Sequence, residues 1–405
     1  MANASVLEVL LHNKPIGTLT RIEGDRSIFA FNESYIADEN RPVLGLRFKD
    51  AYGELITEFR PRRISIMPFF SNLLPEGHMR TYLADLAGVN PVREFFLLGA
   101  LGKDLPGAVT VRPAGGEGQT DAENDNKRTG ESSKDEAMRF SLAGVQLKFS
   151  AMNETAGGLT IPAKGLGGSW IIKLPSREFA GVPENEYSMM TLAGLIGMDV
   201  PAIKLVKTAE ISNLPAGIEN LGGQTFAIER FDRVQNGGKI QTEDFAQVFN
   251  VYPGDKYKKA SIRNIAEVVG IEGSITDIAE FIRRLTFNTL IGNADMHLKN
   301  WSLLYPDRRN AALAPAYDFI STVHYIPDTE AALKFSRTRR FDEFSEDELK
   351  HLAARARLPE RLVLDTAHET VALFHQFWQS EKANLPLDSD IIRSVENHVN
   401  TIPLR

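Results

Sequence analysis

The sequence predicts an α+β fold in which a small front domain precedes a strand-rich lobe and a helix-rich lobe. Residues 1–112 mix short strand patterns with helical segments, residues 138–235 carry consecutive strand patterns, and residues 236–405 show mainly helical periodicity. Residues 113–137 contain almost no large apolar side chain, so burial cannot offset their ordering entropy, and we expect a flexible linker or loop there.

Composition places the chain among ordinary globular proteins. It has 405 residues, of which 43% are hydrophobic and 24% charged, enough for two or three domains with buried cores. The net charge of -7 argues against a protein that coats nucleic acid through bulk electrostatics. The absence of cysteine excludes thiolate nucleophiles, cysteine-ligated metals and disulfides.

No segment predicts contact with a membrane. The amino terminus lacks the basic region of a signal peptide, and no apolar stretch approaches the ~20 residues that a spanning helix requires. We therefore expect a cytoplasmic protein.

The front domain is expected to combine strands with two helices. Alternating patterns predict strands at 5–11, 27–31 and 43–48, and a helix is expected from about Pro75 to a stop at Gly88. The run EFFLLGALGKDLPGAVTV then predicts a second helix, a Gly/Pro turn and a further strand.

The strand-rich lobe is predicted from three neighbouring segments, FSLAGVQLKFSAM, GLTIPA and SWIIKLP, joined by glycine-containing turns. A helix follows in ENEYSMMTLAGLIGM, where apolar residues recur at helical spacing. The segments AIKLVK and QTFAIERF predict two more strands.

The remaining chain is predicted to be helical, with one hairpin-like pair. Ser274 and Asp277 form a capping-box pattern before an apolar stripe, and Ser345 with Glu348 forms a second helix-start signal. The segments LPERLVLDTAHETVALFHQFW and DIIRSVENHV predict two further helices, and WSLLY with ALAPAYDF predicts the hairpin.

The segment DMHLKN has the spacing of a kinase catalytic loop, D-x-x-x-x-N. Phosphoryl transfer needs a carboxylate for the hydroxyl proton, metal ligands beside the phosphates and a lysine on those phosphates. Asp295 would accept the proton, the Asn300 amide oxygen would bind Mg²⁺, and Lys299 would neutralise charge on the γ-phosphate. The alternative is a polar loop in which Asp and Asn cap or turn the chain, because this spacing alone also occurs by chance.

Asp318 is the candidate second metal ligand. It lies eighteen positions after Asn300 in Tyr-Asp-Phe, which is similar to the metal-binding aspartate of D-F-G without its glycine. The predicted hairpin would carry Asp318 back to the catalytic loop. A solvated aspartate after a strand is the alternative.

Lys173 is the candidate phosphate-binding lysine, since it is the one lysine on the apolar strand SWIIKLP. A lysine at the edge of an ordinary strand is the alternative. Glu184 or Glu186 on the following helix could pair with it, and the sequence does not choose between them. Either could equally be an exposed acid at a helix start, where the helix dipole favours negative charge.

Three weaker patterns complete the candidate site. The small residues of SLAGVQLK would let backbone N–H groups approach phosphates, although a strand with a turn explains them equally. The segment 229–233 ends the strand series where a kinase places its interlobe hinge, or is a salt-bridged turn. His297 with Asp295 could suggest a metal site, or a loop histidine. The polar clusters QTEDFAQ and DKY stand out without a chemical derivation.

Together these segments resemble the HipA family of bacterial toxin kinases. The matching pieces, in family order over residues 141–318, are SLAGVQLK, WIIKLP, ENEY, AIERFDR, QTEDFAQ, DKY, NTLIGNADMHLKN and LAPAYD. GTL, PFFSNLLPEG and PGAVTV are similar to the family's front domain. The resemblance implies a two-lobed protein-kinase-like fold, with a β-rich ATP-binding lobe, an all-helical catalytic lobe and a small α+β N-terminal subdomain.

The resemblance also implies an ATP- and Mg²⁺-dependent serine/threonine protein kinase. Asp295 would be the catalytic base, and Asn300 and Asp318 would hold Mg²⁺. The expected ATP contacts are Ala143, Gly144, Val145, Gln146, Leu147, Lys148, Lys173, Glu229, Arg230, Phe231, His297, Leu298, Lys299, Asn300, Tyr317 and Asp318. Family members autophosphorylate a serine at the position of Ser141, which expels its loop and switches the kinase off. A phosphoserine adds about -1.5 to -2 charge beside the phosphate site, so repulsion would favour this expulsion.

The family's partners give further expectations. Members pair with a HipB-like helix-turn-helix antitoxin, so operator DNA would be reached mainly through that partner. The expected protein substrate is a translation component such as an aminoacyl-tRNA synthetase, whose inactivation arrests growth. One alternative is a weakly catalytic, kinase-shaped partner and co-repressor of a DNA-binding antitoxin. Another is a metal-dependent hydrolase that uses Asp295, His297 and Asp318.

Overall fold

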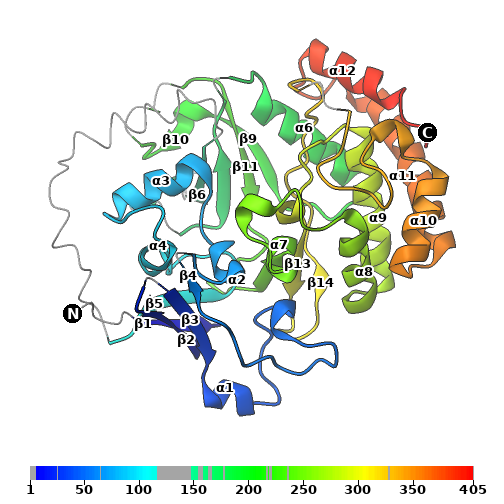
Figure 1. Ribbon diagram of the computed structural model, residues 1–405. Coiled ribbons are helices and arrows are strands. Elements are labelled where there is room, and N and C mark those ends of the chain that lie inside the picture. Colours follow the sequence, from blue (N-terminus) through cyan, green and yellow to red (C-terminus); the bar gives the residue numbers. More distant parts are fainter. Residues whose placement is uncertain are drawn as a thin grey trace.

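The structure is a computed structural model. It describes residues 6–24, 26–63, 65–115, 147–153, 158–162, 167–176, 178–215, 218, 221–234, 237–326 and 329–404. Most of the expected linker at 113–137 lies outside these residues, as do Ser141, Ala143, Gly144, Val145 and Gln146. The fold is α+β, as predicted, with three sheets and a set of helices gathered towards the carboxyl-terminal end (Figure 1).

The front domain is built on a five-stranded antiparallel sheet in the order β4-β3-β2-β1-β5. Its elements are β1 (Val6–Leu11), β2 (Lys14–Ile22), β3 (Arg26–Phe31), α1 (Glu33–Ala37), η1 (Leu46–Phe48), β4 (Arg62–Arg63), α2 (Pro68–Ser71), α3 (Gly77–Leu86), α4 (Glu94–Leu101) and β5 (Val109–Pro113). The predicted helix after Pro75 is confirmed as α3, and Gly88 behind it adopts a positive φ of 66°.

The prediction of a strand at 43–48 is wrong, because this segment ends in the 3₁₀ helix η1. Two of its backbone N–H groups bond to residues of the carboxyl-terminal lobe: the Val43 N–H donates to the Arg308 carbonyl, and the Leu46 N–H donates to the side-chain carboxylate of Glu243. Phe48 is buried in an aromatic cluster, with its ring centroid 5.0 Å from that of Phe69. Tertiary packing therefore overrides the local alternation.

A six-stranded sheet in the order β10-β7-β6-β8-β11-β9 forms the strand-rich lobe. Its elements are β6 (Lys148–Asn153), β7 (Leu159–Thr160), β8 (Trp170–Lys173), α6 (Val182–Leu195), β9 (Ile203–Lys207), η2 (Thr208–Glu210), β10 (Ile211–Ser212) and β11 (Gln224–Glu229). In the antiparallel register Lys173 of β8 lies opposite Lys148 of β6. Directly paired residues share a face of a sheet, so these two lysines point the same way.

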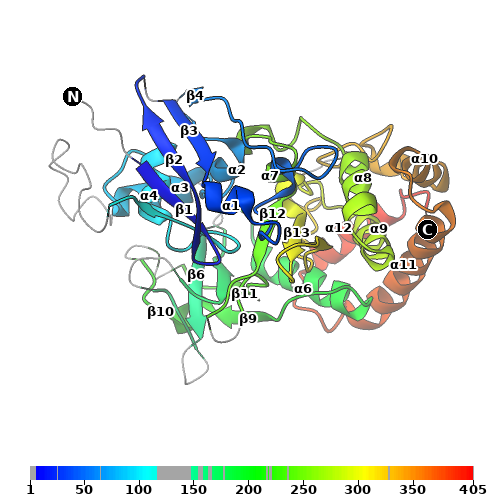
Figure 2. The same cartoon turned by 90° about the horizontal axis from the view of Figure 1, so that it is seen from below.

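The carboxyl-terminal lobe is mainly helical but contains a three-stranded sheet in the order β12-β13-β14. Its elements are β12 (Gln241–Asp244), α7 (Phe245–Val248), η3 (Pro253–Asp255), α8 (Ile262–Glu272), α9 (Ile275–Leu290), η4 (Leu298–Asn300), β13 (Ser302–Tyr305), β14 (Ala312–Leu313), η5 (Phe341–Glu343), α10 (Glu346–Ala356), α11 (Glu360–Glu381) and α12 (Ser389–Val399). The expected hairpin is confirmed as β13 and β14, while β12 was not predicted. Figure 2 shows the front sheet and the six-stranded sheet on one side and α8–α12 on the other.

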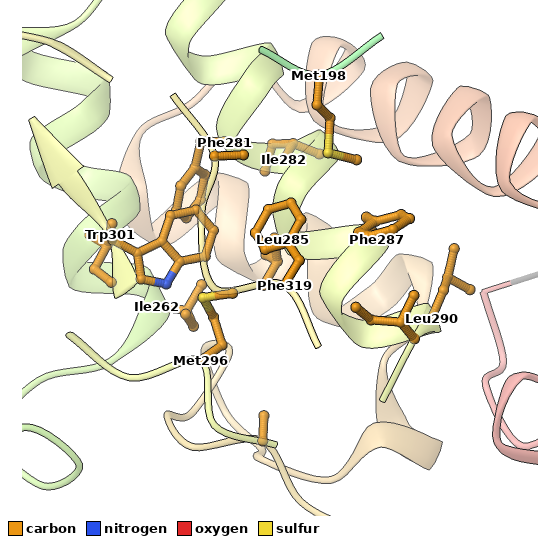
Figure 3. Close-up of a cluster of buried hydrophobic side chains, with 14 of the residues drawn as sticks. Met198, Ile262, Phe281, Ile282, Leu285, Phe287, Leu290, Met296, Trp301 and Phe319 are labelled. Atoms are coloured by element: carbon orange, nitrogen blue, oxygen red, sulfur yellow. The ribbon is translucent and has the colours of Figure 1, made fainter. Parts of the chain in front are cut away.

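Helix α9 lies at the centre of the largest buried core and leads into the loop that carries Asp295 and Asn300. Ser274 and Asp277 form the predicted capping box at its start. Behind them the helix buries Phe281 against Trp301, with ring centroids 4.9 Å apart, and Phe287 against Phe319 at 5.6 Å (Figure 3). Burying each such ring stabilises the folded state by roughly 1.5–3 kcal/mol. The segments before and after the loop at 295–300 are therefore both anchored in the core. Among the described helices, none has the length and apolarity to cross a membrane.

Candidate active site

Lys173 is the buried centre of the site. Its Nζ donates hydrogen bonds to Glu186 Oε1, from α6, and to Asp318 Oδ1, after β14. The side chains of Lys173 and Glu186 are only 5% and 3% exposed. The structure thus pairs the strand lysine with Glu186, which settles the choice between Glu184 and Glu186 that the sequence left open. Burial opposes ionisation of Lys173, but the two carboxylates outweigh it and raise the pKa of Lys173 above its ordinary value.

Asp318 faces both lysines of the strand-rich lobe. Besides its bond to Lys173, its Oδ2 lies 3.6 Å from Lys148 Nζ. Burial opposes ionisation of Asp318, but Lys148 and Lys173 more than compensate and hold its pKa well below the ordinary value. Its backbone has a φ of 58°, an uncommon left-handed conformation for a non-glycine residue. An ionised carboxylate is the form that binds a metal ion.

Asp295 is held by a tyrosine that the sequence patterns left unexplained. The Tyr257 hydroxyl, from the DKY segment, donates to Asp295 Oδ1 at 2.7 Å. Removal of water by the surrounding protein raises the pKa of Asp295, while Tyr257 and the nearby charge of Lys256 favour the carboxylate. Asp295 is nevertheless an exposed residue. A substrate hydroxyl can therefore reach its carboxylate from solvent.

The loop around Asp295 is fixed by asparagine side chains. Asn293 Nδ2 donates to Asn288 Oδ1 at 2.8 Å and to the Asp318 carbonyl at 3.2 Å, so it joins the end of α9 to the segment that carries Asp318. Asn300 Nδ2 donates to the Asp295 carbonyl at 3.0 Å. That bond occupies the amide nitrogen of Asn300 and orients its side chain, which leaves the amide oxygen available as a ligand.

His297 and Leu298 lie inside the loop. His297 is 6% exposed, and its ring packs edge-on against Tyr257 at 5.0 Å between centroids. Its Nδ1 is buried and has no hydrogen-bond partner among the described residues. Burial and then the charge of Lys256 lower the pKa of His297 to about 3, so its imidazole is neutral. Leu298 is fully buried in the core, so only its backbone could approach a nucleotide.

Lys299 contacts the front domain. Its Nζ lies 2.8 Å from Asp244 Oδ2 and donates to the carbonyl and the side-chain oxygen of Asn72 at 2.9 and 3.1 Å. Glu76 is a further carboxylate at 3.7 Å. The structure thus places Lys299 in a bridge between the loop, the QTEDFAQ segment and the PFFSNLLPEG segment, whereas the sequence suggested a role at the γ-phosphate.

The segment at the end of β11 is an ion-pair cluster. Arg230 contacts Asp232, with Nη2–Oδ2 at 3.0 Å, and Asp104 of the front domain at 3.3 Å. The side chains of this segment therefore form the salt-bridged turn that the sequence offered as the alternative to a hinge. Phe231 packs on Tyr317, with ring centroids 5.6 Å apart, and the Tyr317 hydroxyl donates to the Lys299 carbonyl at 2.8 Å.

The donor set fits a magnesium ion. Mg²⁺ prefers oxygen ligands and is usually held by one or two carboxylates together with phosphate oxygens. Asp318 offers an ionised carboxylate and Asn300 an amide oxygen, so these two residues would hold the ion. Within the described residues, no group of three or more His, Cys, Asp or Glu side chains is placed to bind a metal. The ligand set of the hydrolase alternative, with Asp295 and His297 beside Asp318, is not assembled there.

Comparisons with known proteins cover the whole chain. The family model described as HipA-like C-terminal domain matches residues 140–378, and the HipA N-terminal domain matches residues 7–112. A protein of Sinorhizobium fredii named "Putative kinase Y4dM" is 56% identical over 407 residues, which is 100% of this chain and 98% of that protein.

Two Shewanella oneidensis comparisons extend this result. The serine/threonine-protein kinase toxin HipA is 27% identical over 310 residues, covering 68% of this chain and 67% of that protein. The solved complex of HipA, HipB and operator DNA contains a chain with a TM-score of 0.73 and 20% identity, covering 98% of this chain and 95% of that chain. The fold is thus shared with HipA and is kinase-like.

The Lys173 pairing gives a prediction with a built-in control. We expect Glu186→Gln to lower kcat/KM for ATP-dependent phosphate transfer at least ~10-fold, because Lys173 loses a buried, charge-assisted partner worth about 1.5–3 kcal/mol. Glu184→Gln, on the same helix turn, should leave kcat/KM unchanged. Steady-state kinetics with labelled ATP measures both, and equal losses in the two variants would contradict the assignment of Glu186.

A second prediction concerns the pH dependence of Asp295. Tyr257→Phe removes a hydrogen bond to the charged carboxylate, so the pKa of Asp295 should rise further and the acid limb of kcat/KM should move to higher pH. Tyr252→Phe, a tyrosine of the preceding segment with no described bond to Asp295, is the control. An unmoved acid limb in Tyr257→Phe would show that this contact does not tune the base.

Proposed function

The chain belongs to the HipA family, and on that premise we propose that it is an ATP- and Mg²⁺-dependent serine/threonine protein kinase. The observation that carries the proposal is the buried Lys173 held between Glu186 and Asp318, the arrangement that a kinase uses to bind phosphates beside a metal-binding aspartate. Asp295 and Asn300 stand on one loop after α9, joined by a side-chain hydrogen bond.

In the proposed reaction, the oxygen of a serine or threonine hydroxyl attacks the γ-phosphorus of ATP. The bond from that phosphorus to the β-γ bridging oxygen breaks, and ADP leaves with its electron pair. Asp295 accepts the hydroxyl proton, and Lys173 and Lys148 offset negative charge on the phosphates. A bound Mg²⁺ would supply further charge neutralisation on the phosphate oxygens.

Tyr257 would act as a positioning residue for the base. Its hydroxyl holds the Asp295 carboxylate in the described structure, and the approaching substrate hydroxyl also needs that carboxylate as acceptor. Asn293 keeps the loop at a fixed distance from Asp318 by bonding its carbonyl. Orientation of the reacting groups is the main contribution that a phosphoryl-transfer site can make.

The biological role is proposed from membership of the family. We infer that the kinase acts as a toxin, phosphorylates a translation component such as an aminoacyl-tRNA synthetase, and arrests growth. The Shewanella oneidensis relative is named a toxin, and its solved complex contains HipB and operator DNA. A HipB-like antitoxin is therefore the proposed partner, and operator DNA would be contacted mainly through it.

Autophosphorylation of Ser141 is the proposed off switch. Ser141 lies outside the described residues, seven positions before Lys148, whose ammonium contacts Asp318. A phosphate on this serine would bring negative charge beside the phosphates of bound ATP, so repulsion between like charges would favour expulsion of the segment.

The decisive test compares the wild type with Asp295→Asn. With labelled ATP and candidate protein substrates, Asp295→Asn should lose at least ~100-fold in transfer, since general-base catalysis contributes typically 10²–10⁴-fold. Binding of ATP, measured by calorimetry, should persist in the variant. Equal transfer by both proteins would refute Asp295 as the base. ATP binding without transfer by the wild type would favour the weakly catalytic co-repressor.

The same reactions report on Ser141. Phosphopeptide mapping after incubation with ATP should find phosphate on Ser141 in the wild type and none in Asp295→Asn. An active wild-type preparation with unmodified Ser141 would remove autophosphorylation from the proposal and leave the kinase assignment intact.

A further inference from the structure

A cavity remote from the catalytic residues has a composition that the kinase function does not explain. Its volume is about 250 Å³, and none of its lining residues belongs to the candidate active site. The lining residues come from β2 and β3, from η1, from β4 and the segment that leads into it, from the residue before α2, and from the turn after α7. It therefore spans the front domain and the start of the carboxyl-terminal lobe.

Among the described residues, two buried polar atoms in the walls have no hydrogen-bond partner. They are the Nε of Arg47 on η1 and the Oδ1 of Asn250 after α7. Buried polar groups are almost always bonded, so two unsatisfied groups in one cavity point to a ligand that completes them. Arg47 requires an acceptor and Asn250 Oδ1 requires a donor.

The charge of the cavity is positive. Arg47, Arg60 and Arg62 line it, against Glu58 as the single lining carboxylate. Within the part of the chain that the structure describes, no carboxylate forms an ion pair with any of these arginines. Phe29 and Phe59 add aromatic surface, with their ring centroids 5.7 Å apart. Arginine groups that are not neutralised by the protein favour an anion, and they match phosphate oxygens in geometry.

We propose that this cavity binds the phosphate group of a phosphate monoester. A phosphate offers several acceptor oxygens to the arginines, and its monoanion carries one P–OH that can donate to Asn250 Oδ1. The volume lies below the 300–1,000 Å³ typical of drug-sized ligands, so it suits a phosphate on a small body and excludes a whole nucleotide. The source is either a free phosphorylated metabolite or a phosphorylated side chain of a protein.

Binding there would strengthen the contact between the front domain and the carboxyl-terminal lobe. Arg47 and Arg62 belong to the first and Asn250 to the second, and the next residue, Val251, already accepts a hydrogen bond from Asn72 at 2.7 Å. Asn72 also contacts Lys299 of the catalytic loop. An occupied cavity is thus connected to the loop through one asparagine.

Calorimetric titration of O-phosphoserine into the full chain, saturated with Mg²⁺ and ADP to fill the ATP site, tests the site. We expect saturable binding that Arg47→Met and Arg62→Met each weaken at least ~10-fold, the usual consequence of losing a charge-assisted bond. Arg361→Met, on an exposed arginine of α11, is the matched control and should bind like the wild type. Serine without phosphate should not bind.

The remaining outcomes also decide the matter. Binding of a phosphoserine peptide tighter than O-phosphoserine would identify a phosphorylated protein as the source, and the reverse a free metabolite. If Arg47→Met fails to fold, Arg62→Met carries the test, because Arg62 is exposed. Absence of saturable binding, or affinities unchanged in both variants, would overturn the proposal without touching the kinase assignment.

Discussion

The site depends on the burial of one positive charge. An ammonium group inside a protein is tolerated only when carboxylates compensate for its lost hydration. Lys173 obtains them from two distant parts of the chain, Glu186 on α6 and Asp318 after β14. The same ion pairs fix the six-stranded sheet against the carboxyl-terminal lobe and keep Asp318 ionised. The position and the charge state of Asp318, the proposed metal ligand, therefore have one physical origin.

The catalytic loop depends on contacts outside itself. At its start, Asn293 bonds it to the Asp318 carbonyl. Near its end, Lys299 bonds to Asp244 on β12 and to Asn72 of the front domain. The front domain also contacts the end of β11, because Asp104 pairs with Arg230. A domain without any of the proposed catalytic residues is thus part of the support of both the loop and the hinge-like segment.

The sequence predicted the features that chemistry restricts most. Phosphoryl transfer requires particular residue types at particular spacings, so Asp295, Asn300, Asp318 and Lys173 could be named as candidates from the pattern and given roles through the resemblance to the HipA family. The structure brings Lys173 and Asp318 into contact. The partner of Lys173 could not be predicted, because the choice between Glu184 and Glu186 depends on which way each faces on α6. The strand β12 was missed because its buried residues are polar. Gln241, for example, is satisfied by the Leu44 carbonyl rather than by apolar neighbours.

Tyr257 was missed for a similar reason. Its bond to Asp295 joins residues 38 positions apart, and no local pattern encodes such a contact.

The central claim is that the buried Lys173 organises a phosphate-binding site, and affinity for ATP tests it most directly. Calorimetry with Mg²⁺ and ATP should show one bound nucleotide per wild-type chain and at least ~10-fold weaker binding to Lys173→Met. Equal affinity in a folded Lys173→Met variant would contradict the account.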